Sequence, residues 1–286
     1  MLQKAADEID SDTPRLDAEL LMAQATGWSC TSLRAWPERR LTDEQEETFE
    51  RFLARRMAGE PIAHILGQQE FWSLTLKVNS ATLIPRPDTE CLVETALALA
   101  LPVDAKVLDL GTGTGAIALA LRSERPSWQV TATDVVPEAT ALARFNAEQL
   151  GLTVDVVHSH WFSELRPERF NLIVSNPPYI EADDQHLNEG DVRFEPRSAL
   201  TAGADGLEDL RLIISQAPEW LAPGGWLLVE HGFDQAAAVQ ELFTAAGFDA
   251  VASHQDYGQQ DRLTLGQQRA AKSNHYPLQL QEPTGC

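Results

Sequence analysis

The sequence predicts an α/β fold in which a mostly parallel, doubly wound sheet follows a small helical N-terminal domain. From Asp88 onward, helical patterns alternate with short runs rich in β-branched residues, which is typical of a parallel sheet covered by helices on both faces. One run leads into a glycine-rich turn and another into Asn-Pro-Pro-Tyr. Because the carboxyl ends of parallel strands meet at one edge of a sheet, we expect both segments to share a crevice.

Residues 1–68 are predicted to form the helical domain. Thr42-Asp43-Glu44-Gln45 is a capping-box pattern that opens a helix. The apolar face of this helix is predicted to run from Phe49 through Phe52 and Leu53 to Met57.

Residues 69–87 are predicted to form a β-hairpin linker. Apolar and polar residues alternate between Glu70 and Leu83, with Asn79-Ser80 as the candidate turn. Glu70 and Arg86 are candidate ion-pair partners within this linker.

Residues 88–266 are predicted to hold the sheet, and residues 267–286, polar with two prolines, a disordered tail. The predicted strands are Lys106–Leu110, Gln129–Asp134, Val154–His158, Asn171–Ser175, Trp226–Glu230, Phe248–Ser253 and Arg262–Leu265.

The glycine-rich turn follows the first of these strands. It consists of Gly111, Thr112, Gly113, Thr114 and Gly115, and a helical pattern begins at Ala116. A strand, a tight turn and a helix in this order let a ligand approach backbone amides closely. Asp134 ends the next strand about twenty residues later, where a carboxylate can accept both hydroxyls of a ribose. The pattern predicts a nucleotide-type cofactor.

The spacing of the turn fits either a dinucleotide or S-adenosylmethionine. Asp109 stands just before the glycines. A carboxylate there would repel a pyrophosphate but suits a ligand that carries an ammonium group and a sulfonium centre. Asp109 therefore favours S-adenosylmethionine over a dinucleotide.

The second motif, Asn176-Pro177-Pro178-Tyr179, follows the apolar run Leu172–Ser175. Two prolines cannot donate to a sheet ladder, so the carbonyls of Asn176 and Pro177 are expected to be free. The Asn176 side chain offers a further acceptor and Tyr179 a flat ring. These groups could grip a planar amino group at its edge and cover one of its faces.

Together, the Asp-x-Gly-x-Gly-x-Gly turn, the ribose carboxylate and Asn-Pro-Pro-Tyr resemble the class I S-adenosylmethionine-dependent methyltransferases, whose sheet is Rossmann-like. Members with this tetrapeptide methylate exocyclic amino groups of bases or side-chain amides of glutamine. The formal net charge is −21 and the pI is near 4.6, so the protein's average electrostatic field repels a polyanion such as a nucleic acid. The sequence offers no strong basic patch that would compensate. A protein substrate is favoured, and no direct nucleic-acid binding is expected.

Further segments resemble the bacterial release factor glutamine methyltransferases, and the likeness covers nearly all of residues 12–266. They are Gly59–Gly67, Glu70–Trp72, Leu83–Glu90, Arg193–Arg197 and Gly203–Leu207. The resemblance implies transfer of a methyl group to the amide nitrogen (N5) of the glutamine in the Gly-Gly-Gln motif of peptide chain release factors. A ribosomal protein is the alternative substrate, and a nucleic acid a more distant one. The family usually has slightly more chain before the position of Met1.

The resemblance also implies roles by position, and an antiparallel strand near Arg262. The glycine turn (Gly111, Thr112, Gly113, Thr114 and Gly115) would cradle the methionine side of the cofactor, Asp134 would bind the ribose, and Trp161 would neighbour the adenine. Asn176, Pro177, Pro178 and Tyr179 would bind the glutamine, and Asn176 would also contact the cofactor. One departure is His160, which stands where relatives often carry an acidic residue that can bind the adenine amino group.

In the resulting hypothesis, Asn176, Pro177 and Tyr179 carry out catalysis by positioning. The Asn176 side-chain oxygen and the Pro177 carbonyl accept the two amide hydrogens, Tyr179 holds the glutamine plane, and S-adenosylhomocysteine is the second product. No general base is evident. Glu195 and Arg197, in the loop after the tetrapeptide, are candidates for substrate contact or for capping a turn.

Composition suggests few additional features. The three cysteines are scattered without metal-ligand spacing and are expected to be free thiols, and no metal site is predicted. The sequence lacks a signal-peptide pattern and a membrane-spanning apolar run, so we expect a monomeric cytoplasmic protein. A nucleotide-dependent oxidoreductase and a non-catalytic release factor adaptor remain as rival functions.

Overall fold

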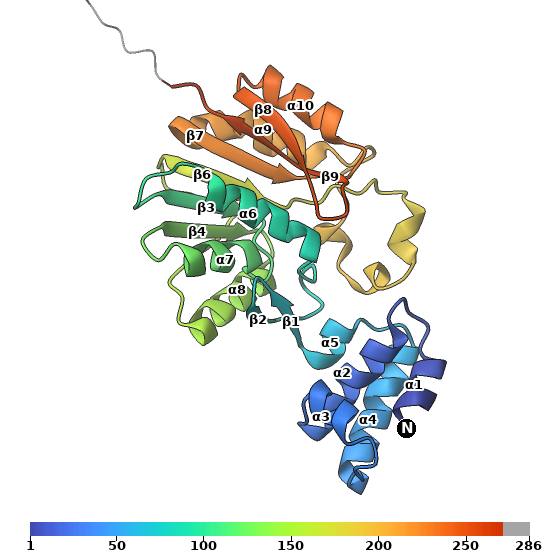
Figure 1. Cartoon of the computed structure of the whole chain (residues 1–286). Coiled ribbons are helices and arrows are strands. Elements are labelled where there is room, and N and C mark those ends of the chain that lie inside the picture. Colours follow the sequence, from blue (N-terminus) through green and yellow to red (C-terminus); the bar gives the residue numbers. More distant parts are fainter. Residues whose placement is uncertain (271–286) are drawn as a thin grey trace, which may run out of the picture.

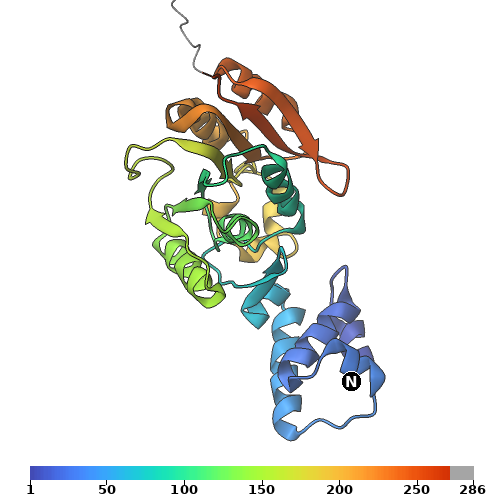
Figure 2. The ribbon, with the colours of Figure 1, turned by 60° about the vertical axis from the view of Figure 1, so that its left-hand side comes forward.

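The N-terminal helices pack around a hydrophobic core of their own. The structure, a computed structural model, describes residues 1–270. Figure 1 shows these helices at one end of the molecule, and Figure 2 shows them apart from the sheet. Leu21 and Phe49 are the largest fully buried side chains of this core. The helices are α1 (Leu2–Glu8), α2 (Pro14–Thr26), α3 (Cys30–Ala35), α4 (Asp43–Met57) and α5 (Ile62–Leu66).

The predicted capping box opens α4. The Thr42 hydroxyl accepts the N–H of Gln45 (3.3 Å), and the Gln45 side chain accepts the N–H of Thr42 (3.0 Å). Phe49 is buried below this cap, with Phe52 packed against the same core. The predicted apolar face was wrong at its end, because Met57 is 50% exposed.

A two-stranded hairpin, β1 (Gln68–Phe71) and β2 (Leu74–Lys77), links these helices to the sheet (Figure 1). Its turn is Trp72-Ser73, not the predicted Asn79-Ser80. Both turn residues have positive φ, at 51° and 59°, which suits the twist of a tight hairpin. Asn79 instead shapes a turn after β2, where its side chain accepts the N–H of Ala81 (2.9 Å).

The sheet has seven strands in the order β5-β4-β3-β6-β7-β9-β8. The first five in this order, β5, β4, β3, β6 and β7, are parallel, and β9 is antiparallel to both of its neighbours, β7 and β8. This confirms the predicted fold class. The strands are β3 (Lys106–Leu110), β4 (Gln129–Asp134), β5 (Asp155–His158), β6 (Phe170–Ser175), β7 (Leu221–Glu230), β8 (Asp249–Gln255) and β9 (Asp261–Gln267). The predicted tail therefore begins inside β9, and the rest of that prediction, beyond residue 270, lies outside the described residues.

Alternate residues of the central strands enter two different cores. Val107 of β3 faces the core that holds α6, α7 and α8, whereas Leu108 faces the core that holds α9 and α10. This period of two places helices on both faces of the sheet. The helices are η1 (Pro87–Thr89), α6 (Glu90–Ala98), α7 (Ala116–Glu124), α8 (Pro137–Leu150), η2 (Gln185–Asn188), η3 (Val192–Phe194), η4 (Arg197–Ala199), α9 (Glu208–Trp220) and α10 (Ala236–Ala245).

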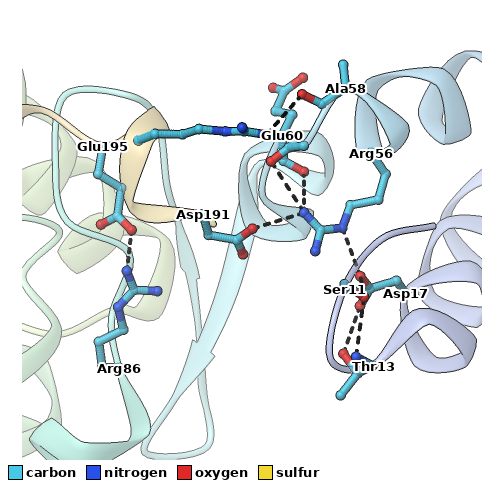
Figure 3. Close-up of polar contacts among 11 residues, drawn as sticks. Ser11, Thr13, Asp17, Arg56, Ala58, Glu60, Arg86, Asp191 and Glu195 are labelled. Carbon is cyan, nitrogen blue, oxygen red and sulfur yellow. Dashed lines mark hydrogen bonds and ion pairs between the residues drawn. The ribbon is translucent and has the colours of Figure 1, made fainter. Parts of the chain in front are cut away.

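The segment between β6 and α9 connects the sheet to the N-terminal helices (Figure 3). The Arg56 guanidinium donates to Asp17 Oδ2 (2.8 Å) and to Asp191 Oδ1 (2.9 Å). Glu195 is buried and accepts hydrogen bonds from the N–H of Ile84 (3.0 Å) and from Arg86. Arg86 thus pairs with Glu195, and its predicted pairing with Glu70 was wrong.

Arg56 is the buried centre of this contact, with 7% of its surface exposed. Removing one partner of a buried ion pair leaves the other charge unpaired, at a cost of about 3–5 kcal/mol. We expect Arg56→Met to lower the free energy of unfolding in urea by about 3 kcal/mol. Arg55→Met is the matched control, because Arg55 pairs with Glu60 closer to the surface, where a pair contributes at most about 1 kcal/mol. Equal losses in the two variants would contradict this account.

In the described part of the chain, no helix combines the length and the hydropathy needed to cross a bilayer. Cys30 and Cys91 are free thiols, as predicted, and Cys286 lies outside the described residues. The same part of the chain contains no cluster of three or more His, Cys, Asp or Glu side chains that could hold a metal ion.

Candidate active site

The glycine turn and the Asn-Pro-Pro-Tyr segment lie side by side because β3 and β6 are neighbouring strands. Leu110, the last residue of β3, is paired with Ser175, the last residue of β6. The Ser175 hydroxyl also donates to the Leu110 carbonyl (2.8 Å). The strand order reverses here, since β4 and β5 lie on one side of β3 and β6 on the other. Open α/β sheets bind ligands at such a switch point.

The turn requires glycine at two positions, because of its backbone conformation and of close packing against neighbouring side chains. Gly111 has φ of 69°, and a Cβ there would lie 3.1 Å from the Trp161 ring. Gly115 has φ of 88° and is the N-cap of α7, and a Cβ there would lie 3.0 Å from Leu119 and 3.4 Å from Ala143. These left-handed conformations strain any residue with a side chain. The sequence folds locally in this way because glycine stands at both positions.

Asp109 stabilises the glycine turn through hydrogen bonds. It is fully buried, and its Oδ2 accepts the Thr112 hydroxyl (2.6 Å) and the N–H of Ala118 (3.2 Å). Burial raises its pKa to about 7, against the lowering effect of these two donors. Asp109 is not among the residues that line the cavity. The interpretation of Asp109 as a neighbour of the cofactor's ammonium group therefore gives way to a structural role.

Asp134 lies at the carboxyl end of β4 and faces the cavity. Its Oδ2 accepts the N–H of Gly113 (2.9 Å) and its Oδ1 accepts the N–H of Val136 (2.9 Å). Burial raises its pKa, while the backbone donors oppose that shift. Each carboxylate oxygen has two lone pairs, so both can accept a further hydrogen bond from a pair of hydroxyls.

A cavity of about 280 Å³ joins the two motifs. The predicted site residues that line it are Gly111, Thr112, Gly113, Thr114, Asp134, Trp161, Asn176 and Pro178. Gly115, Pro177 and Tyr179 were also predicted but lie outside the lining. His160 lines the cavity beside Trp161, with ring centroids 6.0 Å apart.

The side-chain amide of Asn176 has a hydrogen-bond partner at its nitrogen but none at its oxygen among the described residues. Its Nδ2 donates to the Thr89 hydroxyl (3.1 Å). Among the described residues no donor contacts its Oδ1 or the backbone carbonyls of Asn176 and Pro177. The acceptors that the prolines were expected to leave free are therefore available.

Tyr179 points away from the lining of the cavity. Its hydroxyl donates to Glu230 Oε1 (3.2 Å), and its backbone carbonyl accepts the Gln235 side chain (3.0 Å). Burial and the nearby Glu230 charge raise the pKa of Tyr179. The predicted cover of the glutamine plane is thus not a wall of the cavity, because this ring packs into the core with α9 and α10.

Sequence comparisons identify the family. The chain is 60% identical over 259 residues to the release factor glutamine methyltransferase of Pseudomonas aeruginosa, covering 90% of this chain and 94% of that protein. It is 50% identical over 257 residues to the release factor glutamine methyltransferase of Escherichia coli K12, covering 90% of this chain and 93% of that protein. The chain belongs to the release factor glutamine methyltransferase family.

Two family models match the two parts of the chain. Residues 1–67 match the PrmC N-terminal domain, and residues 87–192 match the Methyltransferase small domain. A methyltransferase from Pyrococcus furiosus shares the fold, with a TM-score of 0.55, 18% identity, and coverage of 76% of this chain and 97% of that protein. Family membership confirms the resemblance drawn from the motifs.

Sequence reasoning missed several residues at this site or left them without a role. Thr89 lies within a segment that carried the resemblance, but its contact with Asn176 is made across 87 positions of sequence. Asp209, in the first turn of α9, lines the cavity near Trp161 and has its pKa raised by burial. Glu230 ends β7, and an acidic residue at the carboxyl end of a central strand was the available signal. Glu195 and Arg197 lie outside the lining.

The buried Asp109 gives the protein a pH-dependent stability. Its pKa is raised from an ordinary value of 3.8 to about 7, so the folded protein holds the proton more tightly than the unfolded chain. The contribution is full below pH 3.8 and is lost as pH rises through about 7. Between pH 3.8 and about 7, this group should lower the unfolding free energy of the unmodified protein by about 4 kcal/mol. We expect Asp109→Asn, measured in urea without cofactor, not to show this decline. Parallel curves for the two proteins would contradict this assignment.

Proposed function

We propose that this chain transfers a methyl group from S-adenosylmethionine to the side-chain amide nitrogen (N5) of the glutamine in the Gly-Gly-Gln motif of peptide chain release factors. One observation carries the proposal: a nucleotide-type cradle and the free acceptors of Asn176 line or border a single cavity. The names of the relatives point to the same substrate class.

The residues present fit S-adenosylmethionine. Gly111 lets the turn approach the Trp161 ring, and both residues line the cavity. The Asp134 carboxylate retains lone pairs for a ribose. We assign the methionine side to Gly111–Thr114 and the adenine side to Trp161, with Asp209 and His160 nearby. When bound, the cofactor supplies a methyl group made electrophilic by its positive sulfur.

Asn176 Oδ1 and the Pro177 carbonyl would accept the two hydrogens of the glutamine amide. Amide nitrogen is a poor nucleophile because its lone pair is delocalised into the carbonyl. Fixing this nitrogen in line with the methyl carbon would therefore be the largest contribution to catalysis, lowering the activation barrier by up to about 7–11 kcal/mol. The two acceptors also stabilise the positive charge that grows on this nitrogen as its bond to carbon forms. The nitrogen loses a proton only after methylation, so no general base is required earlier.

We assign substrate docking to the N-terminal helical domain, residues 1–68, with residues 69–87 as linker and residues 88–266 as the catalytic domain. A folded protein substrate needs a surface beyond the cavity, and the domain contacts the segment that follows the Asn-Pro-Pro-Tyr motif through Arg56 and Asp191. We also propose that the enzyme is cytoplasmic, since its proposed substrate takes part in translation, and that it acts as a monomer.

The test is transfer of labelled methyl groups from S-adenosylmethionine to a panel of acceptors at equal concentration. A release factor should accept label, and a variant of it in which glutamate replaces the Gly-Gly-Gln glutamine should not. Faster labelling of ribosomal proteins or of RNA than of the release factor would overturn the proposed substrate. Binding of NAD in preference to S-adenosylmethionine would overturn the proposed chemistry.

A further inference from the structure

Asn176 can serve the proposed reaction in only one orientation of its side-chain amide. The amide presents an oxygen at one end and an NH2 group at the other, and rotation by half a turn exchanges them. With Nδ2 on Thr89 (3.1 Å), Oδ1 is the end left to accept an N–H. In the reverse orientation the NH2 group would meet the NH2 group of the substrate, and no hydrogen bond would form.

Thr89 holds Asn176 in the required orientation only while its hydroxyl acts as an acceptor. A hydroxyl has one proton, and a proton directed at Asn176 would favour the reverse orientation of the amide. Thr89 is 4% exposed, so water offers little alternative to partners within the protein. The orientation of Asn176 therefore depends on where the Thr89 proton goes.

Glu230 is the group that can take this proton. It is 1% exposed at the carboxyl end of β7. Burial raises its pKa to about 7, while the Thr89 hydroxyl and the charge of Arg262 oppose that shift, so Glu230 is a carboxylate at pH 8. Its Oε1 accepts the Tyr179 hydroxyl (3.2 Å), while its buried Oε2 has no hydrogen-bond partner among the described residues. A carboxylate only accepts hydrogen bonds, so at pH 8 the open Oε2 favours a Thr89 hydroxyl that donates towards Glu230 and accepts from Asn176.

We propose that Thr89 and Glu230 are positioning residues that fix the Asn176 amide with its oxygen towards the substrate glutamine. Tyr179 belongs to the same network, because its hydroxyl occupies the other oxygen of Glu230. This inference rests on the proposed function, since it assigns a purpose to an acceptor at Asn176. Glu230 itself does not line the cavity and acts through Thr89.

The experiment compares threonine variants in methyl transfer to a release factor at pH 8. Thr89→Val keeps the shape of the side chain and removes its hydroxyl, and we expect kcat to fall about tenfold, the effect of one lost hydrogen bond. The dissociation constant of S-adenosylmethionine should not change. Thr89→Ser keeps the hydroxyl and should restore most of kcat. Thr133→Val is the matched control, because Thr133 is fully buried, lies outside the lining, and has no partner for its hydroxyl among the described residues.

Glu230→Gln provides the second measurement, which holds even if Thr89→Val folds poorly. Glutamine has the same shape but can also donate, so it no longer dictates the direction of the Thr89 proton. We expect kcat to fall severalfold without loss of cofactor binding. If Thr89→Val matches Thr133→Val, if Thr89→Ser is as slow as Thr89→Val, or if Glu230→Gln retains full kcat, the inference is wrong. An unmodified chain that fails to methylate the release factor would instead refute the proposed function.

Discussion

Asn176→Ala should lower kcat for methylation of a release factor by about 10²–10³-fold, the range seen when one preorganised polar contact to the reacting group is removed. The substitution deletes the side-chain oxygen proposed to hold the substrate amide, and it leaves the glycine turn untouched. The dissociation constant of S-adenosylmethionine should therefore stay close to that of the unmodified protein. Single-turnover methylation and equilibrium cofactor titration measure the two quantities separately.

Asn171→Ala is the matched control for this prediction. Asn171 lies on the same strand, β6, but towards its opposite end, where its side chain accepts the N–H of Lys106 (2.9 Å). Its loss should leave kcat near the unmodified value. Normal turnover in Asn176→Ala would refute the assignment, and a loss that merely follows weaker cofactor binding would do the same.

Asp134→Ala should weaken S-adenosylmethionine binding by about 10²-fold. Two hydrogen bonds from ribose hydroxyls to a carboxylate would together contribute about 3 kcal/mol, which corresponds to that factor in the dissociation constant. The substitution also releases the N–H groups of Gly113 and Val136, so part of the glycine turn loses its support. Isothermal titration with the cofactor gives the affinity directly.

Asp155→Ala controls for the loss of a carboxylate near the same sheet. Asp155 begins β5, the neighbour of β4, and its side chain is exposed at the opposite edge from the cavity. Cofactor affinity should be unchanged in this variant. An Asp134→Ala protein that binds the cofactor as tightly as Asp155→Ala would contradict the ribose assignment.

Sequence reasoning located the strands of the sheet closely, and the reason is physical. Strands such as β3 and β4 are short and mostly buried, and each ends at a clear signal, the glycine turn or Asp134, so their predicted bounds match the structure. The hairpin turn was missed because Trp72 and Ser73 adopt positive φ without the Asn-Gly or Asp-Gly signal that usually marks such turns. The start of β7 was also missed, because its first part contains Gly224 and Gly225.

The two motifs of the site could be predicted because each is contiguous in sequence, and the parallel sheet then brings them together. Contacts between distant segments could not be predicted. The ion pair of Arg86 with Glu195 spans 109 positions, and local alternation instead suggested Glu70. The Tyr179 hydroxyl turns to Glu230 across 51 positions, so a ring expected to cover the substrate is held in the core.

The most direct test of the central claim is intact-mass analysis of a release factor incubated with this protein and S-adenosylmethionine, followed by fragment sequencing of the modified peptide. The account predicts the addition of a single methyl group, carried on the side-chain amide of the Gly-Gly-Gln glutamine. An unchanged mass under conditions where the cofactor binds, or a methyl group on any other residue, would contradict it.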